Sequence, residues 1–408
     1  MQVNIKYLRH KNFLWIAFFL MVFMNLSAQK KITPAFAENE TYKMYLNKNW
    51  KGLISVGKKA LDYEYDYFYL RMRLGIAYYE LQNYKIAQTH FSKALAFNSK
   101  NDLAKEYLYY CYLFTGKNEE ARKLSNLFSP KLSKKLLHTK QSKIEFVNFE
   151  GAIKSTDKDY LDSNNKNHFE SAKYLQIGLK HYVKKSYSLF HAATYFNQNT
   201  SLGEVKQLQY YLNATIPLKN NWAISPAFHL INTKFTGNSN NQFLSSNNNN
   251  IALSLSIKKN IEKIDLSLGT TFSNTGANDQ INHFGTLSYA PFGNSKFVIG
   301  TTEYLHTSDN YENSTLAHAP FVYFKPTKLT SIKLSYLKND TSNIIEDNGY
   351  LVNNSYDLTE QRVSTLIDLK ISKRASVYGM YQHEKKLHTI DNFNYYYNLL
   401  LFGIKINH

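Results

Sequence analysis

The pattern of hydrophobic and polar positions changes near residue 143. From there to the C-terminus, apolar residues occupy every second position in segments of about 9 to 15 residues, as in residues 251–258 and 362–371. Such alternation is typical of β-strands with two different faces. Residues 34–135 instead have helical spacing. We therefore predict an α+β multidomain chain, with helices over 34–135 and a β domain over 143–408.

The links between the fourteen candidate strands alternate in length along the β domain, with six short links and seven long ones. The long links are rich in Asn, Ser and Asp, as in residues 236–248 and 339–358. Short turns at one end, longer loops at the other and an apolar outer band are typical of transmembrane barrels. We predict an antiparallel transmembrane β-barrel of about 14 strands. A soluble periplasmic β-sandwich is the alternative, since the alternation also fits that fold.

A repeat with a period of 34 residues is the main feature of the helical region. Small residues recur where paired helices must approach closely, and large ones recur between neighbouring helices. The positions concerned are Leu74, Gly75, Tyr78, Ala87, Phe91 and Ala94 in the unit 68–101, followed by Leu108, Tyr112 and Ala121 in the next unit. These residues resemble the tetratricopeptide pattern, and about three units fit into residues 34–135. The resemblance implies an α-solenoid that docks a protein or ligand, and the alternative is a spacer.

The N-terminus has the pattern of a secretory signal peptide. Lys6, Arg9 and Lys11 precede an uncharged apolar run from Phe13 to Met24. This run is too short for a membrane-spanning helix, which needs about 20 apolar residues. We predict a signal peptide over residues 1–28; an uncleaved membrane anchor is the alternative.

The formal net charge of +18 is concentrated in the N-terminal third of the chain. Residues 1–142 contain 23 Lys and Arg against 10 Asp and Glu. A basic excess of this kind favours a periplasmic partner that is acidic, an anionic polymer or anionic lipid head groups. A solvated basic surface without a partner is the alternative. Nucleic acid is not expected as a partner of an exported protein.

Residues with metal-binding or catalytic chemistry form no recognisable motif. Cys111 is the only cysteine, which excludes a disulfide framework, and no H-E-x-x-H, G-x-S-x-G or P-loop pattern occurs. We therefore predict no catalytic site, no metal and no cofactor. The alternative is a barrel hydrolase or acyltransferase with a site at the loop rim, where His383-Glu384 and His388 lie near one loop and His306 with Asp309 near another.

Charged residues on the polar side of the predicted strands are expected to face a watery lumen rather than lipid. They are Lys180, Lys258, Asp265, Lys333, Arg362, Asp368 and Lys370. Such residues can line a pore, or they can form a structural network of ion pairs. Both interpretations fit the sequence.

Repeats followed by a C-terminal barrel, behind one signal peptide, resemble the fusions of Gram-negative envelopes that include the YaiO-like outer-membrane family and larger polysaccharide exporters. The resemblance is one of architecture, because residue-level motifs support only the repeats. It implies a non-enzymatic protein in the outer membrane, in contact with its lipid, with the repeats in the periplasm. The repeats would dock a partner or polymer, and the barrel would act as a transporter, export pore or anchor.

Overall fold

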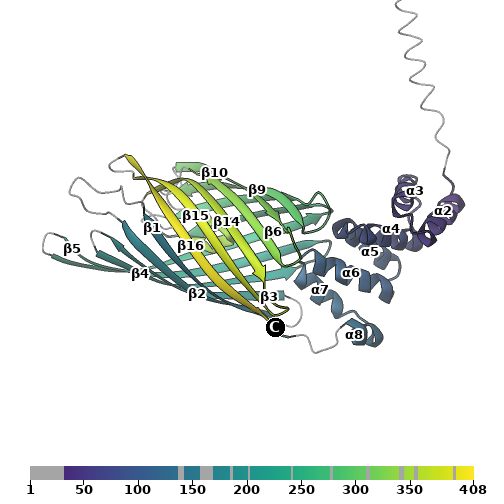
Figure 1. The fold of residues 1–408 in the computed structure, drawn as a ribbon, viewed down its shortest axis with the longest axis horizontal. Coiled ribbons are helices and arrows are strands. Elements are labelled where there is room, and N and C mark those ends of the chain that lie inside the picture. Colours follow the sequence, from purple (N-terminus) through teal and green to yellow (C-terminus); the bar gives the residue numbers. More distant parts are fainter. Residues whose placement is uncertain are drawn as a thin grey trace, which may run out of the picture.

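The computed structural model describes residues 32–136, 142–156, 169–183, 187–200, 203–239, 242–275, 279–308, 313–339, 344–352, 357–388 and 392–408. The predicted signal peptide lies outside these residues. A module of helices stands at one end of a barrel of strands, and the C-terminus lies at that same end (Figure 1). The predicted change from helix to strand near residue 143 is therefore present.

Seven helices form the module over the described residues: α2 (Pro34–Leu46), α3 (Trp50–Asp62), α4 (Phe68–Glu80), α5 (Tyr84–Phe97), α6 (Asp102–Phe114), α7 (Asn118–Ser125) and α8 (Pro130–Leu136). Asparagine caps begin three of them, because the side chains of Asn49, Asn83 and Asn101 accept hydrogen bonds from backbone N–H groups three residues ahead. Within the part of the chain that is described, no helix is long and apolar enough to cross a bilayer.

The nine repeat positions lie at contacts between these helices. Leu74, Ala87, Phe91 and Ala94 are fully buried, and Tyr78, Leu108 and Ala121 are nearly so. Tyr112 packs against the same core. A Cβ atom on Gly75 would lie 2.6 Å from the Phe91 ring, so only glycine permits this approach of α4 to α5.

Fourteen strands close into one antiparallel barrel. They are β1 (Ile144–Thr156), β2 (Phe169–Val183), β3 (Tyr187–Thr200), β4 (Gly203–Pro217), β5 (Trp222–Ser239), β6 (Gln242–Ile261), β7 (Ile264–Ser273), β8 (Gln280–Tyr289), β9 (Phe297–Ser308), β10 (Asn313–Phe324), β11 (Thr330–Lys338), β14 (Leu358–Lys370), β15 (Ala375–His388) and β16 (Phe393–Asn407). Pairing of β1 with β16 completes the closure, for example between Phe149 and Ile404. The predicted barrel is confirmed, and the sandwich alternative is wrong because all these strands belong to one closed sheet.

Residues 236–248 are not the long loop that the sequence suggested. Strands β5 and β6 are 18 and 20 residues long, and their pairing continues through Ser239 and Gln242. The many Asn and Ser side chains suit contact with water, but they do not prevent the backbone from forming the hydrogen bonds of a hairpin. Polarity in this segment therefore marks where the strands leave the apolar band.

The two faces of each strand differ as the alternation predicts. On β6, Leu253, Leu255 and Ile257 are exposed on the outside, whereas Ala252 and Ser254 between them are buried on the inside. Equivalent apolar side chains on the other strands form an outer band. The inner wall is polar and aromatic.

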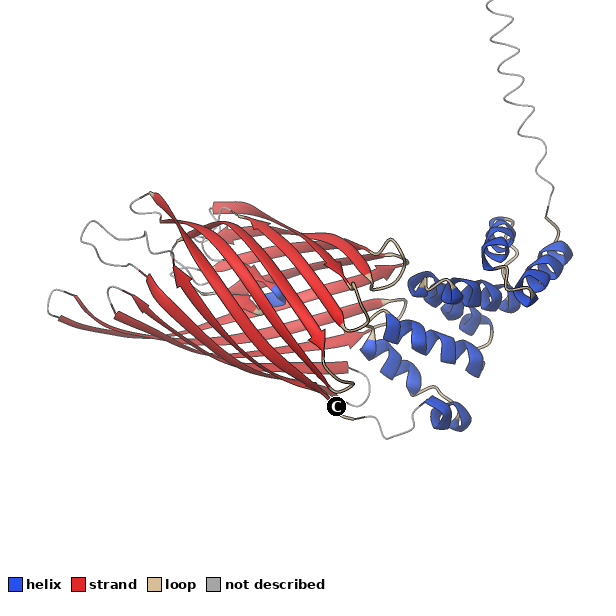
Figure 2. Cartoon of the chain, in the orientation of Figure 1, coloured by secondary structure: helices blue, strands red, loops and turns tan. Residues whose placement is uncertain are grey.

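The described part of the segment between β11 and β14 lies inside the barrel, whereas the sequence predicted an outer loop over residues 339–358. Its described part contains the short strands β12 (Ile345–Glu346) and β13 (Leu351–Val352) and a single 3-10 turn, η2 (Asp347–Gly349). Figure 2 shows this turn inside the ring of strands. Residues 344–352 are called the inward segment below.

Gly75→Val tests the close approach of α4 to α5. Overpacking against Phe91 is expected to destabilise the helical module by about 1–3 kcal/mol. Thermal unfolding of the full chain, followed by circular dichroism at 222 nm, should show an earlier loss of the helical signal. Lys93→Ala, on the exposed side of α5, is the control and should leave the transition nearly unchanged. An unchanged transition for Gly75→Val would contradict this packing.

Candidate functional site

The inward segment is bound to the inner wall through the side chain and backbone of Asn348. Ser254 Oγ donates to Asn348 Oδ1 at 2.9 Å, and Asn348 Nδ2 donates to the Ser225 carbonyl at 3.1 Å. The Tyr211 hydroxyl donates to the Asn348 carbonyl at 3.2 Å. Asn348 has a left-handed backbone (φ 58°), which Asn tolerates better than most residues. The turn therefore presents its polar groups to β4, β5 and β6.

Neighbouring backbone groups of the inward segment are also satisfied by the wall. His229 Nδ1 lies 2.9 Å from the Gly349 carbonyl and is the donor there. Asn282 Nδ2 donates to the Ile345 carbonyl at 2.6 Å. Buried backbone groups left without partners would cost free energy, so these bonds stabilise the segment inside the lumen.

An ion-pair network joins the other side of the inward segment to β14. Arg362 lies 2.5 Å from Glu346, and its guanidinium is 3.9 Å from Glu384. Lys154 on β1 lies 2.8 Å from Glu384. Because the segment contacts β4–β6 on one side and β14 on the other, it crosses the lumen as an ordered constriction.

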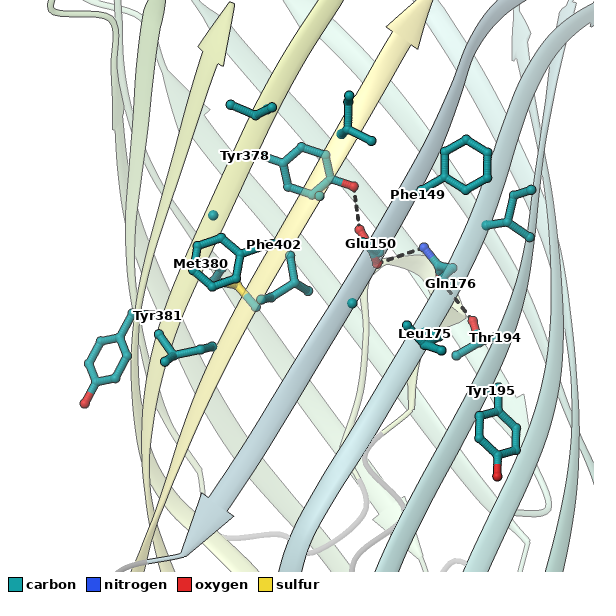
Figure 3. A pocket seen from close by; sticks show the side chains of 18 of the residues that line it. Phe149, Glu150, Leu175, Gln176, Thr194, Tyr195, Tyr378, Met380, Tyr381 and Phe402 are labelled. Carbon is teal, nitrogen blue, oxygen red and sulfur yellow. Dashed lines mark hydrogen bonds between the residues drawn. The ribbon is translucent and has the colours of Figure 1, made fainter.

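A second polar cluster connects the inward segment to β1, β2 and β15. The Tyr350 hydroxyl donates to Gln176 Oε1 at 2.8 Å, and Gln176 Nε2 donates to Glu150 at 2.8 Å. The hydroxyls of Tyr174 and Tyr378 each donate to Glu150 at 2.7 Å. Figure 3 shows the bonds of Glu150 to Tyr378 and Gln176. Glu150 is thus held by three donors.

The outer surface of the same wall carries an apolar groove of about 1170 Å³. Phe149, Leu175 and Phe402 line it from the outside (Figure 3). Gly151 and Gly379 pair with Phe402 on the two neighbouring strands. Because glycine has no side chain, the outer surface is hollow on both sides of Phe402. It belongs to the outer band, whereas the polar chemistry lies on the inner face.

The helical module is joined to the end of the barrel that carries the short turns. Lys85 Nζ lies 2.8 Å from Asp265 Oδ2, and the Lys85 backbone N–H donates to the Gly293 carbonyl at 2.8 Å. Glu119 pairs with Lys180 at 2.7 Å and accepts a hydrogen bond from Ser188. The ion pairs join module side chains to strands of the inner wall.

Basic residues of the module supply several further contacts at this junction. The Arg122 guanidinium lies 3.7 Å from the centre of the Tyr182 ring, and Lys123 Nζ donates to the Pro217 carbonyl at 2.9 Å. Lys117 donates to Gln88, which in turn donates to Asn221 of the β4–β5 turn. Part of the positive charge of the module is therefore engaged with the barrel.

The seven charged residues predicted for the lumen separate into four groups. Lys180 and Asp265 pair with the module, and Arg362 pairs with the inward segment. Lys258 lies four residues after Ser254 on β6 and therefore on the same, inner face. Lys333, Asp368 and Lys370 lie on β11 and β14, where Asp368 is opposite Tyr378 and Lys370 is opposite Ser376.

Several residues at the site were not predicted from the sequence. Glu346, Asn348 and Tyr350 lay in a segment expected to be an outer loop, and Lys85 and Glu119 were counted only as module charge. One signal was available: Asn348-Gly349 is a tight-turn pair flanked by apolar Ile344-Ile345 and Tyr350-Leu351. Apolar residues around a turn indicate a segment that packs against something.

Of the residues considered for a loop-rim enzyme, His383, Glu384 and His388 lie on β15 and His306 lies on β9. His383 and Glu384 are adjacent on β15 and point to opposite faces; His383 contacts Asn398, whereas Glu384 pairs with Lys154. His388 stacks on Phe393. Asp309 lies outside the described residues. Across the described ranges, no three His, Cys, Asp or Glu residues are arranged to hold a metal.

Comparisons with known proteins find similar solved structures that cover about two thirds of this chain. No protein-family model matches the chain, and no curated protein matches it in sequence. The CymD monoaromatic hydrocarbon channel is 6% identical, with a TM-score of 0.47 over 66% of this chain and 89% of that one. The P. putida toluene transporter TodX is 8% identical (TM-score 0.43; 66% and 91%), and the Acinetobacter baumannii outer membrane protein Omp33 is 10% identical (0.38; 66% and 100%). Such identities speak to the fold alone.

A charge reversal tests the junction. Asp265→Lys should place two cations together and release the module, increasing cleavage of α5 by chymotrypsin about tenfold, which corresponds to roughly 1.4 kcal/mol. Exchanging the pair, Lys85→Asp with Asp265→Lys, should restore protection. Equal cleavage of the wild type and the single variant would show that this ion pair does not hold the module.

The pKa of Lys117 predicts a pH dependence of the helical module. Burial lowers this pKa to about 8, and repulsion from the positive charges of Lys85 and Lys258 acts in the same direction. Attraction to Glu120 and Asp265 raises the pKa but does not compensate for burial. The unfolded value is about 10.4. The folded state therefore binds fewer protons between these values, and its stability should rise by about 2 kcal/mol from pH 7 to 9.5.

The measurement is the urea midpoint of the helical signal of the full chain at both pH values. Lys117→Gln should remove most of the increase. An increase of the same size in this variant would assign the effect to other groups.

Proposed function

We propose that this chain is a non-enzymatic channel of the bacterial outer membrane, with the helical module on the periplasmic side. The outer band of apolar side chains on a closed barrel supports the membrane location. In a bilayer, backbone groups have no water to bond, and a closed barrel satisfies them between strands. The polar inner wall supports passage of a solute through the barrel.

The module and the C-terminus lie at the end with the short turns (Figure 1). Short turns face the periplasm in outer-membrane barrels, and longer loops face outward. This orientation gives the module access to periplasmic partners. It also puts the long β5–β6 hairpin on the outside of the cell.

The inward segment is the observation that carries the proposal of a channel. A solute that crosses the lumen must pass residues 344–352, which are held by replaceable hydrogen bonds rather than by covalent links. Water or solute groups can substitute for partners such as Ser254, Tyr211 and Gln176. The segment therefore acts as a gate with a bound and a displaced state.

The module docks a periplasmic protein or polymer in this proposal. Exposed apolar side chains on α2, α4 and α6 support this role; they are Tyr42, Leu46, Tyr69, Leu103 and Leu113. These helices are the first of each pair, and the tetratricopeptide resemblance implies a docking surface on their side. The arrangement of the repeat residues described above agrees with that resemblance.

Conductance through planar bilayers tests the gate. Asn348→Ala combined with Tyr350→Ala removes three side-chain hydrogen bonds and should increase the open probability several-fold. Ser254→Cys with Asn348→Cys should give the opposite result under oxidising conditions, with recovery on reduction. Cys111 is buried and does not compete.

Asn232→Ala is the matched control, because Asn232 makes hydrogen bonds within the β5–β6 hairpin and none to the inward segment. The folded state of each variant is checked by heat-modifiable migration of the outer-membrane fraction on gels. Folded protein that never conducts, in the wild type and in the Asn348/Tyr350 variant, would contradict a channel and favour an anchor.

A further inference from the structure

The helical module covers only part of the barrel mouth. Among the described residues, its hydrogen bonds and ion pairs reach β1 to β4, β7 and the β8–β9 turn, with Glu145 and Lys296 at the two limits. The mouth formed by β10, β11, β14, β15 and β16 receives no such bond. This part is called the open arc.

Three lysines lie on the inner wall of the open arc. Lys370 pairs in register with Ser376, and Ser376 pairs with Lys405. Lys405 lies on the same face of β16 as Gly403. A Cβ atom on Gly403 would lie against the Tyr378 ring inside the barrel, so this face is the inner one. Lys333 on β11 lies over the Phe321 ring at 5.2 Å, and its neighbour two residues on, Ser335, pairs with Phe321. All three ammonium groups therefore belong to the lumen.

The spacing of these lysines suits a single ligand. Lys370 and Lys405 are two strands apart, which corresponds to about 10 Å between their Cα atoms. Long side chains reach across such a distance. Lys333 lies one strand further along, on β11, and nearer the middle of the barrel. A polyvalent anion can contact more than one of them.

These lysines have no carboxylate partner within salt-bridge distance among the described residues. Aromatic rings contact two of them, Phe321 below Lys333 and Phe146 at 5.6 Å from Lys405. Asp368 lies two residues before Lys370 on the same face of β14, and Glu150 on β1 is already held by three donors. The open arc therefore carries an excess of positive charge.

The covered part of the mouth differs in this respect. Lys85 pairs with Asp265, and Lys180 pairs with both Glu119 and Glu145. These two positive charges are paired within the protein. An anion that approaches the mouth is attracted to the open arc, because a cleft with one sign of charge and low-dielectric walls focuses the field.

We propose that Lys333, Lys370 and Lys405 form an oxyanion-binding site at the periplasmic mouth, which selects phosphate- or carboxylate-bearing solutes. The ligand accepts hydrogen bonds from the ammonium groups, and the hydroxyl of Ser376 is a further donor beside them. The phenyl rings of Phe146 and Phe321 lie next to the cations and suit the apolar part of an organic anion. Selection of transported solutes rests on the proposed channel, whereas binding does not.

The first experiment measures the reversal potential of the reconstituted full chain in a KCl gradient. The wild type should prefer chloride over potassium several-fold. The triple variant Lys333→Gln, Lys370→Gln, Lys405→Gln should lose this preference. A matched triple variant, Lys173→Gln, Lys219→Gln, Lys234→Gln, removes equal charge from exposed positions outside the lumen and should keep it.

The second experiment measures binding of inorganic pyrophosphate to the folded protein in detergent by calorimetry. The wild type and the Lys173/Lys219/Lys234 control variant should bind pyrophosphate. The Lys333/Lys370/Lys405 variant should bind it at least tenfold more weakly. Binding without any conductance would support the site and contradict the channel. Conductance with equal selectivity and equal pyrophosphate binding in all three proteins would overturn the site and leave the channel standing.

Discussion

Closure of the sheet between β1 and β16 is the constraint on which the rest of this structure depends. An open edge would leave a row of backbone N–H and C=O groups without partners, which an apolar surrounding does not tolerate. Eleven paired positions from Phe146 to Thr156 satisfy this edge. Once the sheet is closed, each strand has an inner and an outer face, and the alternation of side chains decides which residues meet inside.

The polar residues inside the barrel follow from that geometry. A lumen enclosed by fourteen strands is too wide to be filled by wall side chains alone. Here the inward segment occupies part of it, with Asn348 bonded to β4, β5 and β6 and Tyr350 bonded to β2. Glu346 and Arg362 add a paired charge that would be costly without its partner. The segment thus fills part of the lumen and is held there by polar contacts with the wall.

The junction of module and barrel uses the same inner wall. Lys85 and Glu119 reach Asp265 and Lys180 at the mouth, so the module is held over one part of it. Charge is paired where the two parts meet, whereas Lys333, Lys370 and Lys405 have no salt-bridge partner among the described residues. This asymmetry gives the mouth a neutral, covered part and a basic, uncovered part. The module therefore pairs with lumen charges on one part of the mouth only.

The sequence by itself determined the change from helices to a barrel, the approximate strand number and the alternation of apolar and polar faces along the strands. These properties follow from periodicity, which each residue expresses locally. Tertiary structure decided the fate of residues 344–352, the length of the β5–β6 hairpin and the partners of Lys85, Lys180 and Arg362. The sequence shows that Asn348 and Lys85 are polar. It does not show their partners, because water and a distant protein group can satisfy the hydrogen bonds of a polar side chain equally well. Only the closed barrel, which brings Ser254 to Asn348 and Asp265 to Lys85, selects between them.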